Sequence, residues 1–437
     1  MIFLQKEEPR FFFLRKSTKQ LIMKKSLSPL FLLVSFSFLL CLVASTGCNS
    51  NSEAQLKAYV NEQDPLEIPS LLERSGELAS ATEWPKTKAK VDELKEKIAS
   101  KPEDIKLRLQ VAAIFINEQR VTGEHHYYYK AIEKILDGIL SIDPKNFEAT
   151  VFKASVKMSL HQFPEAKKIA EDARNINPNN AYVYGILVDA NVELGNYEEA
   201  IAMSDKMQAL RPSLEAYSRA SYLREIYGDY NGAIAAMKLA VQAGLPGSEP
   251  QCWCRNILAE LYFNTNQLKE AENTYRENLS LRPSYAPSMA GLAKLEAKNK
   301  NFSAAIALTD SANAIMPGVA YEEQKADIYQ QMGDTKKAGE KFEEVKKLFE
   351  ADAASGHSIS LELARFFIKM NQFDSAQKYA LQEYNIRPKN IEVNKELAWI
   401  AYSQKDIAKA KEYLKIALHT GSKNPELLKR AAVISKS

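Results

Sequence analysis

The sequence predicts an all-α protein, an α-solenoid of stacked antiparallel helix pairs. Three observations carry this prediction. An alanine recurs in one register at a spacing near 34 residues, and a proline follows it about twelve positions later in most copies. The composition also favours helices, because the 437 residues include only 16 glycines and are 46% hydrophobic and 26% charged.

Residues 1–48 are expected to be an export signal with an upstream extension, residues 1–22. The signal starts with Met23-Lys24-Lys25, continues as an apolar run from Leu30 to Val43 and ends in small residues. Whether the upstream extension is translated stays open. Export would place the folded part outside the cytoplasm.

The end of this segment, Val43-Ala44-Ser45-Thr46-Gly47-Cys48, resembles the lipobox of bacterial lipoproteins. The resemblance implies that Cys48 is lipidated and anchors the chain to a membrane of the cell envelope. The outer membrane is favoured, with the folded part in the periplasm or at the cell surface. Ser45 stands where the family usually has an aliphatic residue, so an ordinary cleaved signal and an uncleaved anchor helix are the alternatives.

Residues 49–85 are expected to form a flexible polar tether that ends near Trp84-Pro85, because the segment starts rich in Asn, Ser and Glu. A flexible coil of this length has an end-to-end distance of roughly 35 Å. The tether would hold the folded part clear of the membrane.

The charge of the chain gives no indication of a nucleic-acid partner. The formal net charge of +3 arises from residues 1–48, which hold seven Lys/Arg and two Asp/Glu, so the rest of the chain is close to neutral. A neutral body without a basic stripe lacks the electrostatic footprint of a nucleic-acid-binding protein.

Residues 86–437 are expected to form the solenoid, with about nine repeats. Alanine suits a point where two helices cross too closely for a larger side chain. The steps between alanines of 34, 33, 38, 34, 33, 38 and 34 residues predict a higher unit of three repeats, with longer connections at 243–250 and 351–358 on one edge of the array. The alanines are Ala166, Ala200, Ala233, Ala271, Ala305, Ala338, Ala376 and Ala410.

Each predicted pair turns at a residue that tolerates the left-handed backbone. An aromatic or aliphatic residue two positions later opens the second helix, and proline then starts the next pair, where its missing N–H is harmless. The turn residues are Gly195, Gly228, Asn266, Gly333 and Asn371, with His161, Lys300 and Lys405 in the same position of other copies. The residues that open second helices are Phe163, Tyr197, Tyr230, Leu268, Phe302 and Phe373.

This unit of two helices resembles the tetratricopeptide repeat over roughly residues 100–430. The resemblance implies a right-handed superhelix in which the first helices line a concave groove that receives partners. The family's early tryptophan is absent from its usual place. The first-helix leucine of the motif matches Leu187, Leu258, Leu292, Leu363 and Leu397, and its aromatic matches Tyr262, Tyr329 and Phe367.

The sequence predicts no enzyme, cofactor or metal site. It contains no H-E-x-x-H, G-x-S-x-G or G-x-x-x-x-G-K motif. Cys252 and Cys254 could hold a metal or cycle as a redox pair, but residues two apart on a helix point to different faces, and a zinc site needs about four ligands. We interpret them as two small buried residues of a first helix.

The register places ten side chains on the groove face of first helices. A solvated face with an internal ion pair is the alternative, because tyrosines also pack between repeats. The candidate binding residues are Asp189, Ser218, Tyr222, Glu225, Asn256, Glu260, Lys294, Asp327, Arg365 and Trp399.

The expected function is a membrane-tethered scaffold or adaptor that binds a protein or peptide partner in the groove. One alternative is a small-molecule or glycan-binding lipoprotein of a nutrient-uptake system. A second is an accessory subunit of a membrane enzyme or assembly complex.

The stretch Gly123-Glu124-His125-His126-Tyr127-Tyr128-Tyr129-Lys130-Ala131 is expected to belong to a first, irregular repeat. A first helix from Ile105 to Gln119 precedes it, and His126 occupies the turn position. Tyr128 should pack in the core. His125, Tyr127 and Tyr129 are expected to be exposed, where a binding role is open.

Overall fold

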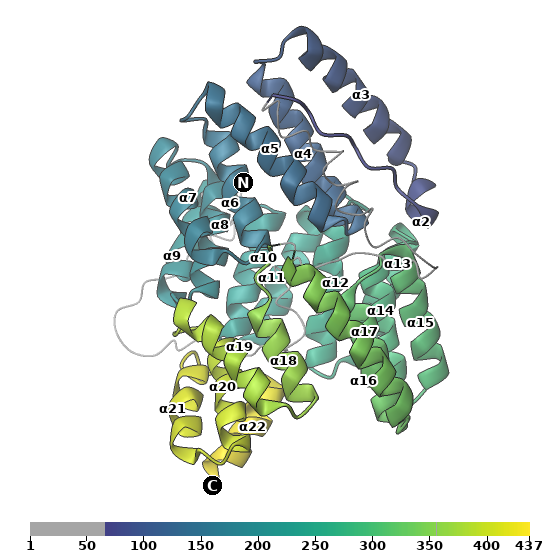
Figure 1. Cartoon of the computed structure of the whole chain (residues 1–437), viewed down its shortest axis with the longest axis vertical. Coiled ribbons are helices and arrows are strands. Elements are labelled where there is room, and N and C mark those ends of the chain that lie inside the picture. The colour runs from purple at the N-terminus through teal and green to yellow at the C-terminus, as the bar shows by residue number, and fades with distance from the viewer. Residues whose placement is uncertain (1–65, 355) are drawn as a thin grey trace, which may run out of the picture.

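The computed structural model describes residues 66–354 and 356–437, and every regular element in these ranges is a helix (Figure 1). The predicted all-α solenoid is therefore confirmed. Helices α2 (Gly76–Ala79) and α3 (Trp84–Ser100) come first, and α22 (Pro425–Ser435) comes last. Nine helix pairs lie between them in the described chain: α4 (Ile105–Thr122) with α5 (His125–Ile142), α6 (Phe147–Ser159) with α7 (Phe163–Ile176), α8 (Ala181–Glu193) with α9 (Tyr197–Leu210), α10 (Leu214–Ile226) with α11 (Tyr230–Ala243), α12 (Glu249–Asn264) with α13 (Leu268–Leu281), α14 (Ala286–Lys298) with α15 (Phe302–Ile315), α16 (Val319–Met332) with α17 (Thr335–Ala354), α18 (Ser360–Lys369) with α19 (Phe373–Ile386), and α20 (Ile391–Ser403) with α21 (Ile407–Ala417).

Short polar side chains cap many of the first helices. Asn146, Asn180 and Asn390 each accept a hydrogen bond from a backbone N–H in the first turn of α6, α8 and α20. Ser213 caps α10 in the same way. Such caps satisfy donors that have no partner within the helix.

The turns inside the pairs have the predicted left-handed backbone, even where glycine is absent. The backbone φ angle is +78° at Gly195, and it is +56° at His161, +65° at Lys300 and +68° at Lys405. A side chain with a Cβ is strained in this region, so these three turns are held by the packing of the helices around them.

The recurring alanines lie at buried helix crossings. Seven of the eight have no exposed surface, and Ala338 is 4% exposed. Ala131 in the first pair is also fully buried. No larger side chain fits at these points without displacing a neighbouring helix.

The second turn of the superhelix contacts the first turn after about six helix pairs. Arg387 donates to the Glu193 carboxylate at 2.5 Å, Asn390 donates to the Glu193 carbonyl at 2.8 Å, and the Ile391 N–H donates to the Tyr197 hydroxyl at 2.9 Å. These partners are 194 to 197 residues apart in sequence. The connections before α20 and before α22 therefore lie against the ends of α8 and α10 and the start of α9. Figure 1 shows the yellow-green ribbons next to the teal ones.

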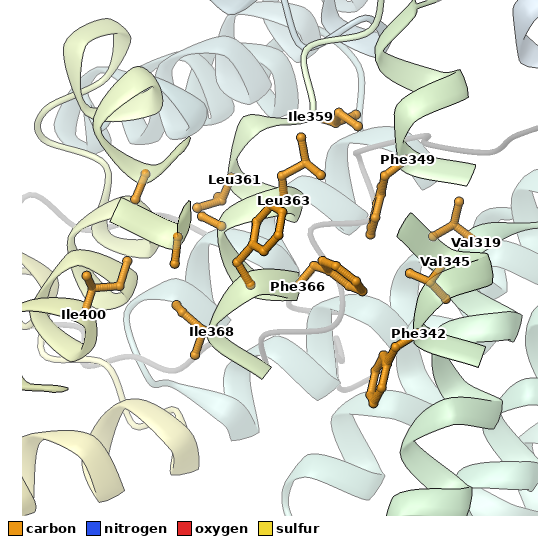
Figure 2. Close-up of a cluster of buried hydrophobic side chains, with 14 of the residues drawn as sticks. Val319, Phe342, Val345, Phe349, Ile359, Leu361, Leu363, Phe366, Ile368 and Ile400 are labelled. Carbon is orange, nitrogen blue, oxygen red and sulfur yellow. The ribbon is translucent and has the colours of Figure 1, made fainter. Parts of the chain in front are cut away.

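The largest core of the second superhelical turn joins α16, α17, α18, α19 and α20 (Figure 2). Phe366 is its centre, with ring centroids 6.1 Å from Phe342 and 5.8 Å from Phe349, both in edge-on geometry. This packing fixes α18, which carries the candidate binding residue Arg365, against the pair before it.

The N-terminal part of the described chain is packed, which corrects the expected tether over residues 66–85. Arg74 is buried and its guanidinium pairs with Glu118 of α4 at 2.8 Å, while Ile68 and Trp84 are also buried. The apolar residues Ile68, Leu71 and Leu72 join the core under α4 and α5, which offsets the cost of ordering the segment. Residues 49–65 lie outside the described chain.

The first pair contains a second correction, since His125, Tyr127 and Tyr129 are 7%, 3% and 6% exposed and thus buried. The packed N-terminal segment covers Tyr127, whose hydroxyl donates to the Ser70 carbonyl. His125 contacts Gln119 of α4 at 3.0 Å and stacks on Tyr129, whose hydroxyl donates to the Ser159 carbonyl of α6 at 3.4 Å. Tyr128 is fully buried, as predicted. His126 is not at the turn, because Gly123 takes the left-handed conformation and α5 begins at His125.

The two longer connections differ in extent. Residues 244–248 join α11 to α12, as predicted. The second connection is shorter than expected, because residues 351–354 continue α17. Three of these four residues are alanines, which favour the helix. Both connections join a second helix to the next first helix.

The export signal and Cys48 lie outside the described chain. Within residues 66–354 and 356–437, none of the helices combines the length and the apolar character that a membrane span requires.

Candidate functional site

The first helices line two adjoining cavities on their inner side, which we call the large lobe and the small lobe. The large lobe is a cavity of about 680 Å³ lined mainly by α12, α14, α16 and α18, and the small lobe is a cavity of about 250 Å³ lined by α4, α6, α8, α10 and α12. Arg120 and Trp253 line both lobes and so mark the boundary between them. We call the two lobes together the chamber.

Asp189, Ser218, Tyr222, Glu225 and Glu260 line the small lobe. Asp189 is buried and accepts from the Arg219 guanidinium at 2.6 Å, and burial raises the pKa of this carboxyl. The Ser218 hydroxyl donates to the Glu215 carbonyl at 3.1 Å. All five side chains carry polar groups, and these two bonds hold Asp189 and Ser218 in place at the inner wall.

Burial raises the pKa of the two glutamates of the small lobe. The pKa of Glu225 rises to about 8, first because of desolvation and then because of the nearby carboxylates of Glu260 and Glu392. The pKa of Glu260 rises to about 7 through desolvation, which outweighs its ion pair with Lys294 at 3.4 Å. Burial also lowers the pKa of Lys294. The lobe thus disfavours uncompensated negative charge.

Asn256, Lys294, Asp327 and Arg365 line the large lobe. Asn256 is buried and accepts from the Ser288 hydroxyl at 3.1 Å. Asp327 pairs with Lys369 at 2.9 Å. The large lobe therefore presents charges that the protein has already compensated.

Arg365 is held by α20. Its guanidinium donates to Glu392 at 2.5 Å and to Glu396 at 3.0 Å, and Glu396 also accepts from Arg430 of α22 at 2.6 Å. Such a network fixes the position of each member, since every charge has more than one partner. A ligand would meet an ordered row of charges on this wall.

Trp399 lines neither lobe. The Arg430 guanidinium lies 5.3 Å from the centroid of its ring, and Tyr402 stacks on it at 5.4 Å. Trp399 belongs to the cores that join α20 to α21 and α22, so its contact with the chamber is indirect, through Arg430.

Four residues outside the predicted groove positions also line the large lobe: Trp253, Tyr285, Tyr321 and Lys369. Tyr285 precedes α14 in a connection, outside the first-helix positions that the register identifies. Trp253 lies between the two cysteines of α12. The three aromatic residues could be identified from the sequence by searching the first helices and the turns before them for aromatic side chains.

The two cysteines of α12 are buried, which confirms their interpretation. Both are free and fully buried, and burial raises the pKa of the Cys252 thiol to about 11. Within the described residues, no group of three or more metal-ligating side chains is present.

Comparisons with known proteins agree with the observed helix pairs. Residues 254–285 match the family model of the tetratricopeptide repeat. No curated protein matches the chain in sequence. The human IFIT1 dimer with PPP-AAAA aligns with a TM-score of 0.50 at 14% identity, over 75% of this chain and 77% of that chain. The APC/C hetero-tetramer Cut9-Hcn1 aligns with a TM-score of 0.47 at 14% identity, over 89% of this chain and 67% of that chain.

The chain is thus a tetratricopeptide-like α-solenoid. The similarity to IFIT1 concerns the fold alone at this identity. Solenoids of this class are generally non-enzymatic and act as protein-interaction scaffolds through their extended concave surfaces.

Proposed function

We propose that this protein is a membrane-tethered scaffold that holds a short segment of a protein or peptide partner in its chamber. The chamber carries this proposal, because first helices from both superhelical turns line it with aromatic and charged side chains. A cavity of about 680 Å³ is within the range of roughly 300 to 1,000 Å³ typical of ligand sites. It accommodates a few residues of a partner, not a folded domain.

A chamber-filling variant tests this proposal. Ala320 lines the large lobe and its side chain is exposed, so Ala320→Trp places a large ring in the cavity without overpacking the core. Ala304 is exposed on α15 and lines neither lobe, so Ala304→Trp is the matched control. Affinity capture from membranes should lose its specific partner with Ala320→Trp and keep it with Ala304→Trp. Identical captured proteins for both variants would refute the chamber as the binding site.

The tether rests on the lipobox resemblance at Cys48. Cys48→Ala should abolish acyl labelling and release the protein into the soluble fraction, since two or more acyl chains are needed for stable anchoring. Unchanged membrane retention would favour an anchor helix instead.

A second candidate is a receptor for a small molecule such as a glycan. The lining of the large lobe favours a glycan, because Tyr285 and Trp253 offer flat apolar surfaces beside polar groups. Calorimetric titration with oligosaccharides distinguishes the two, since a scaffold for peptides should show no heat of binding.

A further inference from the structure

Glu225 is the inner acidic group of the small lobe that lacks a compensating cation. The other charges that line the lobe are paired or at its rim. Asp189 pairs with Arg219, Arg120 pairs with Glu249 at 2.9 Å, and Glu260 pairs with Lys294. The side chain of Glu215 is exposed and accepts from the Ser213 hydroxyl at 2.7 Å. Glu225 has neither a hydrogen bond nor an ion pair from its carboxylate within the described chain, although it lines the cavity.

The surroundings of Glu225 favour a positive charge. The carboxylates of Glu260 and Glu392 act on it from α12 and α20. Both neighbouring carboxylates form ion pairs, Glu260 with Lys294 and Glu392 with Arg365 and Lys395. These cations are therefore already paired with other carboxylates. Tyr222 and Trp253 line the same lobe, and the faces of such rings attract cations.

A second observation, at the boundary between the lobes, indicates that a ligand contributes a hydrogen bond. The indole N–H of Trp253 lines both lobes and is buried without a partner in the described chain. Buried polar groups in proteins are nearly always satisfied, so this donor suits an acceptor such as a peptide carbonyl. The Tyr285 hydroxyl offers a further polar group in the large lobe.

We propose that the chamber recognises a peptide segment with a basic side chain, whose cationic group pairs with Glu225 in the small lobe while its backbone reaches Trp253 and Tyr285. This inference rests on the proposed function and adds the chemistry of the partner. An anionic ligand is disfavoured, because the cations that line the chamber, Arg120, Arg219, Arg282, Lys294, Arg365, Lys369 and Arg430 among them, already have carboxylate partners.

Two peptide pools test the inference on the purified protein. Both consist of acetylated tetrapeptide amides with random positions, except that the third residue is fixed as lysine in one pool and as norleucine in the other. Norleucine keeps the apolar stem and removes the charge. We expect the wild-type protein to bind the lysine pool at least about tenfold more tightly in calorimetric titrations, since a charge-assisted pair is gained.

The variants identify the groups responsible. Glu225→Gln should lower the affinity for the lysine pool to that for the norleucine pool, and Glu103→Gln, an exposed acid with no contact to the chamber, should leave the preference intact. Tyr285→Phe should weaken both pools alike. Melting curves show that each variant is folded.

The outcomes separate this inference from the proposed function. If the wild-type protein binds both pools equally, or if Glu225→Gln keeps the preference for lysine, the basic side chain is not recognised at Glu225 and only this inference fails. If neither pool binds the wild-type protein, both the proposed peptide-binding function and this inference are refuted.

Discussion

The raised pKa of Glu225 makes this single residue a source of pH-dependent stability. Its pKa is about 8 in the folded chain and near 4.5 in the unfolded chain, so the folded state binds the proton more tightly. The stability that this group contributes is complete below pH 4.5 and is lost as the pH rises through 8. We expect Glu225→Gln to flatten this decline and to be more stable than wild type at pH 9 by on the order of 2 kcal/mol.

Urea unfolding of both proteins at pH 5 and pH 9 measures this effect. Glu103→Gln, on the exposed surface, should keep the wild-type pH dependence. Glu260, whose pKa is about 7, leaves a smaller decline in the variant. Equal losses of stability in Glu225→Gln and wild type would show that Glu225 is ionised in the folded protein at low cost.

The positions of the site residues could be predicted from the sequence better than their partners. The repeat register places Glu225 and Arg365 on inner faces, and both line the chamber. Whether a charge there is compensated depends on helices far along the chain. Glu392 of α20 acts on Glu225 of α10 only because the second superhelical turn returns to the first. Local periodicity contains no information about that return.

At the scale of the helix pair, two glycines show where close packing controls stability. Gly291 in α14 faces Tyr275 of α13, and a Cβ there would lie 2.3 Å from two atoms of the ring. Gly339 lies inside α17, where a Cβ would meet nothing within 4 Å. We expect Gly291→Ala to lose about 1 to 3 kcal/mol by overpacking and Gly339→Ala to gain about 0.5 to 1 kcal/mol from helix propensity. Chemical denaturation measures both, and a stabilised Gly291→Ala would show that the Tyr275 ring moves aside freely.

Elements with a repeated sequence signal were predictable, and the irregular pair was not. The turn residues and the buried alanines have the backbone and burial that their spacing indicates. In the first pair, the register predicted an exposed His125, Tyr127 and Tyr129 because it assumed an open end of the array. Residues 66–74 cover Tyr127 at that end, and their packing against α4 and α5 has no counterpart in the repeat pattern. His125 and Tyr129 contact Gln119 of α4 and Ser159 of α6 instead.

At the scale of the whole molecule, the contact between the two superhelical turns decides whether the chamber is enclosed. Gly195 lies at this contact, and a Cβ there would be 2.5 Å from the Lys389 carbonyl carbon. Its φ is +78°, so alanine also strains the backbone. Gly333 provides the matched control, because its φ is +79° and a Cβ there meets nothing within 4 Å.

Gly195→Ala and Gly333→Ala should therefore share the cost of backbone strain and differ in the contact between turns. We expect Gly195→Ala to lose about 1 to 3 kcal/mol more than Gly333→Ala, because Lys389 must move away and weaken the nearby bonds of Arg387 and Asn390 to Glu193. Small-angle X-ray scattering should show a larger radius of gyration for Gly195→Ala alone. Since enclosure brings α20 and its Glu392 toward the small lobe, the same variant should also lose peptide affinity. Equal radii and equal stabilities for the two variants would show that the turns separate without cost, and the chamber would then be an open groove in solution.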